Sequence, residues 1–504
     1  MLESTPSEQH RTAGGAMGTV DIVFFVLAGV SPMGVVVALL TLSIARGNGA
    51  GVPGTYLVAA AVLALFSAGY VRVSRRIVSA GGFYAFAQQG LGRRVGGATA
   101  YVALISYNAA AVGVFGAVAY FGSQVVTALV GTSVSWQVCA VVAFVAVAAL
   151  SYFEVTVSAK VLGVALAAEV LILLAFDAVI LVRNGFHGFS PRVFEPTVVM
   201  GGGFGVSLML AFGSFVGFEA TALYGEEARD PRRCVPRATY ISLGIITGFY
   251  LITTWAAISA YGFDGAQAAA RADTENFIFA ASSGYVGEGF TEVMEILVVT
   301  SLFAAFLAFH SNTARYHVAL ARDGLLPRSL ARIHRRYGSP VTASAWQLGL
   351  VAVVTTAFTA TGHDPYLSMG ISLYGLGVLG IVLLQGVAAA SIVGYFSRHR
   401  QHESIWGSIV APAAGGMGLF GGLVLMILNY STLTGSDLAW INSLPWALPV
   451  AAVIGAIAAG RRTAPRPVAE AALPCTSASA DDVDSTITAD TRSPRPAPAP
   501  VEDQ

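Results

Sequence analysis

The chain of 504 residues is 55% hydrophobic and only 11% charged, which excludes an ordinary soluble domain and indicates a polytopic membrane protein. Its formal net charge is zero, so the composition does not indicate a nucleic-acid partner. The three cysteines, Cys139, Cys234 and Cys475, lack the spacing of a metal site or a disulfide framework, and we expect no metal and no cofactor.

Apolar runs of about 20 residues, the length that crosses a bilayer, predict twelve membrane-spanning helices. Their expected limits are 21–45, 53–73, 97–130, 135–152, 158–182, 204–224, 238–261, 288–321, 340–361, 366–396, 406–430 and 442–460. With both termini in the cytoplasm, only 4 of the 28 Lys and Arg residues fall in outside loops, namely Arg46, Arg183, Arg192 and Arg271. This asymmetry is typical of the cytoplasmic (inner) membrane, so we expect a multi-pass protein there with the lipid bilayer as its partner.

The spans divide the chain into four parts. Residues 1–18 form a cytoplasmic tail, helices one to ten (19–396) form a transport core, and helices eleven and twelve (397–460) form a scaffold. Residues 461–504 are rich in Pro, Ala, Ser and Thr, a composition that cannot form a core and predicts a disordered cytoplasmic tail.

The first span is interrupted near its centre by the stretch AGVSPMG, residues 28–34. Proline removes a backbone donor and glycine weakens a helix, so Gly29, Pro32 and Gly34 predict a break. Irregular backbone at membrane depth is tolerated only where it is buried in protein or lines a cavity. For one proline alone, a kink that the neighbouring helices accommodate explains the pattern equally well.

The sixth span carries a second interruption, GSFVG at residues 213–217, with Glu219 just beyond it. Two broken spans at corresponding places in two halves of a chain are typical of secondary transporters built from repeats. The freed amides and carbonyls of the two breaks are expected to face each other and to bind the charged ends of a small solute.

Several polar side chains lie within the spans. In span three, Tyr107 either bonds a neighbouring helix or contacts the substrate. In span five, Asp177 is expected to reach outside water, whereas Glu169 at mid-depth is costly to ionise and is a functional candidate. Glu219 at the second break is a further candidate for exchanging a proton, and a permanently protonated structural carboxyl is the alternative for both glutamates.

Span eight contains the sequence AFHSNTAR, which places His310 and Ser311 at membrane depth. A lone membrane histidine often serves only as a structural hydrogen-bonding group. Beside the broken helices, we interpret His310 and Ser311 as candidates for a proton or cation site.

Four stretches resemble the amino acid–polyamine–organocation (APC) superfamily, specifically its bacterial amino acid permeases. They are DIVFFVLAGVSPMGVVVA, SAGGFYAFAQQGLGRRVG, FVGFEATALYGEEARDPRRCVPRA and FHSNTARYHVALARDGLLPRSLARIH, and the resemblance covers residues 20 to about 340. It implies an all-α fold of the leucine-transporter type, in which spans one to five and six to ten form an inverted 5+5 repeat with helices one and six broken.

The resemblance also implies a set of substrate-binding residues. The substrate carboxylate would meet amides of the first break, here Val30, Ser31, Met33 and Gly34. The amino group would lie near carbonyls of both breaks, here Ala28, Gly29, Phe212, Gly213 and Ser214. An aromatic gate beside the sixth break would be Phe215 or Phe218.

Sodium-coupled relatives place a cation between the first and eighth helices, where this chain is expected to place His310 and Ser311. Histidine is a poor partner for sodium, which favours proton coupling or no cation. In some proton-coupled relatives a lysine of span five replaces the cation. Here the comparable depth holds Glu169, so that mechanism does not transfer unchanged.

The sequence is therefore interpreted as a permease that imports an amino acid or related amine by alternating access, with a proton as the coupling ion. An exchanger of substrate for product is the alternative within transport. A membrane sensor is disfavoured because the tail after Gly460 does not indicate an effector domain. An intramembrane enzyme is disfavoured because neither a metal-ligand cluster nor a nucleophile–base pair is evident.

Overall fold

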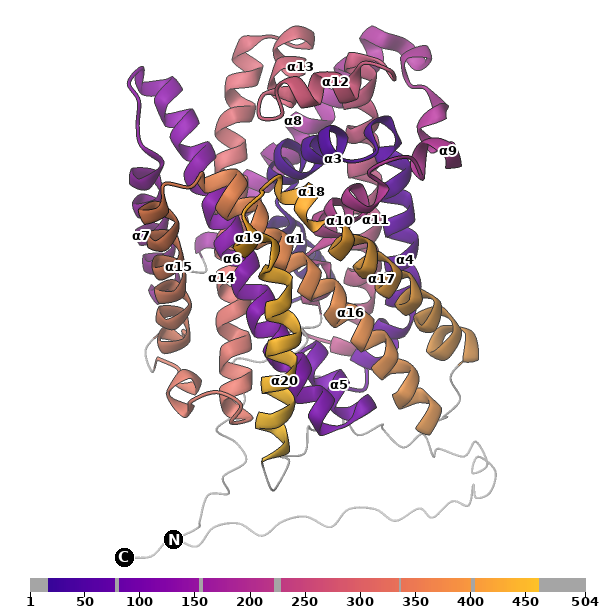
Figure 1. The fold of residues 1–504 in the computed structure, drawn as a ribbon, viewed down its shortest axis with the longest axis vertical. Coiled ribbons are helices and arrows are strands. Elements are labelled where there is room, and N and C mark those ends of the chain that lie inside the picture. The colour runs from indigo at the N-terminus through magenta and orange to yellow at the C-terminus, as the bar shows by residue number, and fades with distance from the viewer. Residues whose placement is uncertain are drawn as a thin grey trace, which may run out of the picture. The chain divides into compact units, whose positions relative to one another are not determined.

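The computed structural model describes residues 17–77, 81–153, 157–221, 228–334, 337–399 and 404–461, and the side chains of 157–163 also lie outside the description. Helices dominate these residues (Figure 1). The sequence expectations for the two tails therefore concern residues that lie almost wholly outside the described part of the chain.

Twelve helical segments within the described residues are long and apolar enough to span a bilayer, which confirms the predicted number. The spans are Thr19–Arg46, Gly49–Ser74, Arg93–Val130, Trp136–Phe153, Val164–Gly188, Phe204–Thr221, Pro231–Tyr261, Glu288–Arg322, Val341–Thr361, Pro365–Arg398, Trp406–Leu428 and Ala439–Gly460. The seventh span begins seven residues earlier than expected. It begins at Pro231 because the basic segment before residue 238 is already helical, with proline in the first turn.

The helices carry the labels of Figure 1. They are α1 (Thr19–Val30), α2 (Pro32–Gly34), α3 (Thr41–Arg46), α4 (Val52–Ser74), α5 (Phe83–Leu91), α6 (Arg93–Val130), α7 (Trp136–Phe153), α8 (Val157–Gly188), α9 (Pro196–Val199), α10 (Phe204–Phe215), α11 (Pro231–Tyr261), α12 (Ala266–Ala272), α13 (Phe277–Tyr285), α14 (Glu288–Arg322), α15 (Val341–Thr361), α16 (Ser372–Arg398), α17 (Ala411–Leu428), α18 (Tyr430–Thr434), α19 (Ala439–Asn442) and α20 (Ala447–Gly460). Two π-helical turns, η1 (Val35–Leu40) and η6 (Pro365–Ile371), precede α3 and α16.

The first membrane helix is broken at Ser31. This residue has φ 58° and ψ 71° and is the only non-glycine with positive φ among the described residues. Pro32 begins the short helix α2 in the next position, where its missing N–H costs little. The expected interruption of the first span is thus a true break in the helix.

The sixth membrane helix is broken after α10. Val216 is extended, and Gly217 has φ 117°, a conformation that side-chain-bearing residues rarely adopt. A Cβ added at Gly217 would lie only 3.3 Å from Cγ2 of Val30. The two breaks therefore meet, as the all-α fold class with broken helices one and six predicts. The inverted relation of the two repeats stays a prediction.

Helix α6 packs against α14, α16 and α20. Gly97 and Gly455 allow α6 and α20 to approach closely, because a Cβ at Gly97 would lie 2.4 Å from the carbonyl oxygen of Gly455. Small residues at such crossings let membrane helices pack by direct backbone contact. This packing holds α6 and α14 beside the broken first helix.

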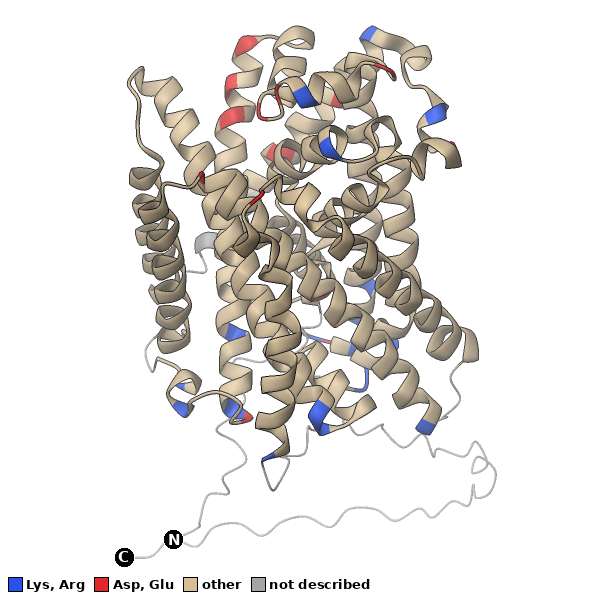
Figure 2. Ribbon diagram, in the orientation of Figure 1, with Lys and Arg blue, Asp and Glu red and all other residues tan. Residues whose placement is uncertain are grey.

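Charged residues are distributed unevenly along the bundle (Figure 2). Asp and Glu gather at the end that carries α12 and α13, whereas Lys and Arg lie mostly at the end that carries α5. The four arginines expected outside, Arg46, Arg183, Arg192 and Arg271, belong to the acidic end, where Arg271 donates to the carbonyl of Ala45 near the end of α3.

Candidate functional site

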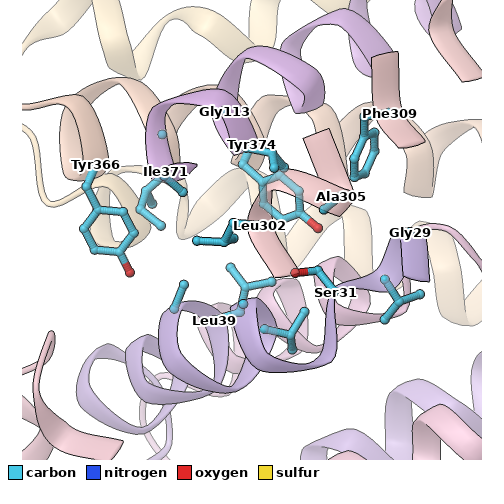
Figure 3. A pocket seen from close by; sticks show the side chains of 17 residues that line it. Gly29, Ser31, Leu39, Gly113, Leu302, Ala305, Phe309, Tyr366, Ile371 and Tyr374 are labelled. Atoms are coloured by element: carbon cyan, nitrogen blue, oxygen red, sulfur yellow. The ribbon is translucent and has the colours of Figure 1, made fainter. Parts of the chain in front are cut away.

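The main cavity encloses about 50 Å³ beside the first break (Figure 3). The lining residues are Gly29, Val30, Ser31, Gly34, Val35, Ala38, Leu39, Gly113, Val114, Ala117, Leu302, Ala305, Phe309, Tyr366, Gly370, Ile371 and Tyr374. Figure 3 shows Ser31 and Tyr374 with their hydroxyls on facing sides of this space. Apart from peptide groups, the polar atoms of the lining belong to hydroxyls, and a mostly apolar pocket with a few placed polar groups is typical of a small-molecule site.

Two of the three π-helical turns in the described residues, η1 and η6, line this cavity, whereas the third, η7 (Trp406–Val410), precedes α17 and does not. Val35 and Leu39 belong to η1, and Tyr366 and Ile371 belong to η6. A π-turn widens the helix locally and is frequent at functional sites. The widened turns of the first and tenth membrane helices thus face each other across the space next to Ser31.

A chain of hydrogen bonds leads from the cavity to Glu169 on α8. The Ser31 hydroxyl lies 2.8 Å from that of Ser301 on α14, and Ser301 donates to Oε2 of Glu169 at 2.5 Å. The Met33 amide approaches the same oxygen at 3.4 Å, and the Gly34 amide approaches Ser301 at 3.4 Å. Glu169 is only 2% exposed. The carboxyl is therefore buried but connected to the break through two hydroxyls.

Glu219 caps the second break. Its Oε2 accepts a hydrogen bond from the Gly217 amide at 2.9 Å, and its Oε1 accepts one from the Tyr107 hydroxyl at 3.4 Å. Both residues line a second cavity of about 10 Å³ together with Gly29, which also lines the main cavity. Glu219 and Tyr107 thus lie next to the first break, in a cavity that shares Gly29 and Phe309 with the main one.

Gly213 belongs to a third cavity of about 10 Å³ that shares Leu39, Ile371 and Tyr374 with the main one. The Tyr374 hydroxyl donates to the carbonyl of Gly213 at 2.8 Å. A side chain of the main cavity therefore contacts a backbone carbonyl of the second break directly.

The remaining residues of the expected substrate site point elsewhere. Phe212 faces α17, because a Cβ at Gly422 would lie 2.8 Å from its ring, and the Ser214 hydroxyl contacts that of Tyr56 on α4 at 2.8 Å. Other members of the expected site are buried but do not belong to the lining of the main cavity: Ala28, Met33, Phe215 and Phe218. The aromatic rings that line it are instead those of Phe309, Tyr366 and Tyr374.

The eighth membrane helix, α14, presents a different residue to the break than expected. His310 contacts Gln347 of α15 through Nδ1 and is fully buried there, and Ser311 is half-buried one residue further on. Ser301, nine residues earlier, occupies the place beside the first helix. The structure therefore places His310 against α15 and Ser301 beside Ser31, while the proton or cation role of His310 and Ser311 stays a prediction.

Sequence reasoning missed Ser301 and Tyr366. Leu302, Ala305 and Phe309 line the cavity at spacings of three and four residues, which marks the inner face of α14. This periodicity was the available signal that the functional face begins near Ser301. Tyr366 follows Pro365 in the π-turn η6, and the local sequence does not predict a π-turn.

Comparisons with known proteins identify the family of the chain. A family model described as "Amino acid permease" matches residues 17–457. An uncharacterized transporter of Mycobacterium tuberculosis is 30% identical over 165 residues, 33% of this chain and 36% of the relative, so the match spans about a third of that relative.

Two relatives whose names state what they transport match over longer stretches. The branched-chain amino acid permease BcaP of Bacillus subtilis is 24% identical over 67% of this chain and 73% of its own. The low-affinity putrescine importer PlaP of Escherichia coli is 24% identical over 77% of this chain and 83% of its own. Family and relatives are transporters rather than enzymes, and the chain belongs to the amino acid permease family of the APC superfamily.

Proposed function

We propose that this protein is a secondary transporter that imports an amino acid or a related amine across the cytoplasmic membrane by alternating access, coupled to a proton. The meeting of the two breaks beside the main cavity carries the proposal, since a Cβ added at Gly217 would lie only 3.3 Å from Cγ2 of Val30, a tight contact. Unwound backbone at such a point can hold the charged ends of a solute without charged side chains.

The substrate is proposed to lie in the main cavity with its carboxylate at Ser31 and its amino group near carbonyls of the two breaks, such as that of Gly213. The amino-terminal end of the helix that begins after a break favours an anion. The carbonyls at the end of the helix before the break favour a cation. The lining named above contains no Asp, Glu, Lys or Arg, so a solute with a neutral, apolar side chain fits better than a diamine. A neutral, apolar substrate agrees more closely with the branched-chain amino acids named for BcaP than with the putrescine named for PlaP.

Proton coupling is proposed to act through Glu169. While this carboxylate is ionised, Ser301 donates to it, and Ser301 can then only accept from the Ser31 hydroxyl. A proton on Glu169 allows the carboxyl to donate to Ser301 and Ser301 to donate to Ser31. The Ser31 hydrogen then becomes free for the substrate carboxylate, so the proton and the substrate favour each other's binding.

Glu219 is a second candidate for proton exchange. Its two oxygens accept from Gly217 and Tyr107, so its protonation would release one of these bonds at the second break. A loosened second break would alter the contact with the first one. We therefore propose that Glu219 influences the opening of the site, whereas Glu169 acts on substrate affinity.

The orientation is proposed from the charge distribution. Lys and Arg lie mostly at the α5 end of the bundle, which the positive-inside rule assigns to the cytoplasm together with both termini. The acidic end with α12 and α13 is then the outside face.

Uptake by the purified full chain in proteoliposomes tests the proposal, with labelled leucine, alanine, putrescine and arginine and with proton and sodium gradients imposed separately. We expect proton-driven accumulation of the neutral amino acids. Uptake driven by sodium alone would refute the proton assignment. Uptake that requires substrate on the other side would support the exchanger, and saturable binding without any uptake would support the sensor.

A further inference from the structure

Buried polar groups continue from the Glu169 site along the contact between α8 and α11. Asp177 is 5% exposed, and its Oδ2 accepts a hydrogen bond from Thr253 of α11 at 2.8 Å. It therefore faces a neighbouring helix and does not reach outside water as expected from the sequence. Further along α8, Asn184 donates to the Ser259 carbonyl of α11 at 2.8 Å and accepts from the Tyr285 hydroxyl at 3.0 Å.

Tyr250 of α11 lies within electrostatic range of Glu169, one helical turn before the Asp177 partner Thr253. It precedes Thr253 by three residues and so lies on the same face of α11. Helical side chains lean toward the amino-terminal end, which brings the Tyr250 ring toward the depth of Glu169. The Tyr250 hydroxyl lies within electrostatic range of that carboxyl, and the rings of Tyr250 and Tyr56 are 5.8 Å apart.

Two buried polar atoms in this region have no hydrogen-bond partner within the described residues: Oδ1 of Asp177 and the hydroxyl of Tyr250. A buried polar group without a partner costs about 1–3 kcal/mol. Buried water commonly supplies the missing bond where two to four polar partners converge. The Thr253 hydroxyl bonds Asp177 and follows Tyr250 by one turn of α11, so it offers a water a further polar partner near both atoms.

We propose that Asp177, Thr253 and Tyr250 form the route by which a proton from the outside face reaches Glu169. The inference rests on the proposed coupling through Glu169. A proton from outside water converts the Asp177 carboxylate to a carboxyl. Each hydroxyl or water along this route then accepts one proton and passes its own proton to the next group. The last proton forms the O–H bond of Glu169, and Asp177 is left ionised again.

The separation of the two carboxyls explains why intermediates are required. Eight residues of helix separate them by about 12 Å along the axis, several times the length of a hydrogen bond. The groups that face them are neutral: α11 contributes Thr253 and Tyr250, and α14 contributes Ser301. A file of neutral hydroxyls between two carboxyls carries a proton without trapping it at a fixed charge.

Two variants test the route in proteoliposomes. Asp177→Asn keeps an acceptor for Thr253 but cannot take up a proton, and Tyr250→Phe removes only the hydroxyl. We expect each to slow proton-driven uptake at least about tenfold, the effect of about 1.4 kcal/mol on a rate. Substrate counterflow without a pH gradient does not require Glu169 to exchange its proton. Its rate should therefore change less than about twofold, which is the error within which independent effects add.

A matched control and a double-mutant cycle complete the experiment. Thr247→Val removes a half-buried hydroxyl of α11 that bonds only the carbonyl of Leu243 of its own helix, and should leave uptake unchanged. In a Glu169→Gln background the proton gradient should no longer drive uptake, and adding Asp177→Asn should change the rate no further.

The outcomes separate the route from the coupling itself. If Glu169→Gln abolishes proton drive but Asp177→Asn and Tyr250→Phe retain it fully, the route is wrong and the coupling stands. If uptake and counterflow fall equally in both variants, their groups only hold α8 against α11, and the route is again wrong. If Glu169→Gln retains full proton drive, both the coupling and the route fail.

Discussion

Ser301 contacts both the Ser31 hydroxyl of the main cavity and the buried carboxyl of Glu169, so Ser301→Ala should uncouple the proton from the substrate. The substitution removes the bond to Glu169 at 2.5 Å and the contact with Ser31 at 2.8 Å. A hydrogen bond to a charged group contributes about 1.5–3 kcal/mol, which corresponds to about a 10- to 150-fold change in an equilibrium. In Ser301→Ala, we therefore expect the proton gradient to increase substrate affinity less than in the parent protein, by this same factor.

The assay is the substrate dependence of initial uptake in proteoliposomes, measured with and without an inward proton gradient. In the parent protein the gradient should lower KM, and in Ser301→Ala the two curves should coincide. Thr300→Ala is the matched control, because the Thr300 hydroxyl is exposed and bonds the Leu297 carbonyl of its own helix. If Ser301→Ala keeps a gradient effect within about twofold of the parent, the change is below about 0.4 kcal/mol and the hydrogen-bond chain has no part in coupling.

Three further substitutions have defined outcomes. Gly217→Ala forces a side chain into a positive-φ conformation next to Val30, at a cost of about 1–3 kcal/mol, so KM for uptake should rise about 5- to 150-fold; an unchanged KM would contradict contact between the breaks. Tyr374→Phe removes the hydrogen bond to the Gly213 carbonyl, which costs about 1 kcal/mol. A binding titration should show about fivefold weaker substrate binding, and equal affinity would exclude Tyr374 from the site. His310→Ala removes a buried contact with α15, so the melting temperature should fall while uptake stays proton-driven; loss of proton drive at an unchanged melting temperature would return His310 to the coupling path.

The parts of the fold that depend on local chemistry were predictable. Span limits follow from runs of apolar residues, and both breaks follow from Gly and Pro, which alter the backbone wherever they occur. Glu169 was identified because an ionisable group at mid-span is rare and costly. These signals are read residue by residue and need no knowledge of which helix lies opposite.

The contacts between helices were not predictable in the same way. Helix α10 is surrounded by protein, with 94% of its most apolar window buried, so its sequence has no polar face to show which residues meet the cavity. The sequence therefore did not show that the side chains of Phe212 and Ser214 face α17 and α4, and the role of their carbonyls in substrate binding stays a prediction. Along a helix as long as α14, the depth that meets the break depends on neighbouring helices, which explains the choice of His310 over Ser301.

The left-handed turn at Ser31 has a consequence for how the first helix moves. Glycine would adopt this conformation freely, whereas a serine there costs about 1–2 kcal/mol and is offset by its hydroxyl contact with Ser301. The backbone at Ser31 is therefore strained, and a contact with another helix, α14, holds it in this conformation. When the Ser301 hydroxyl moves away from Ser31, this strain is no longer offset, and the outer half of the first helix should rotate about Ser31.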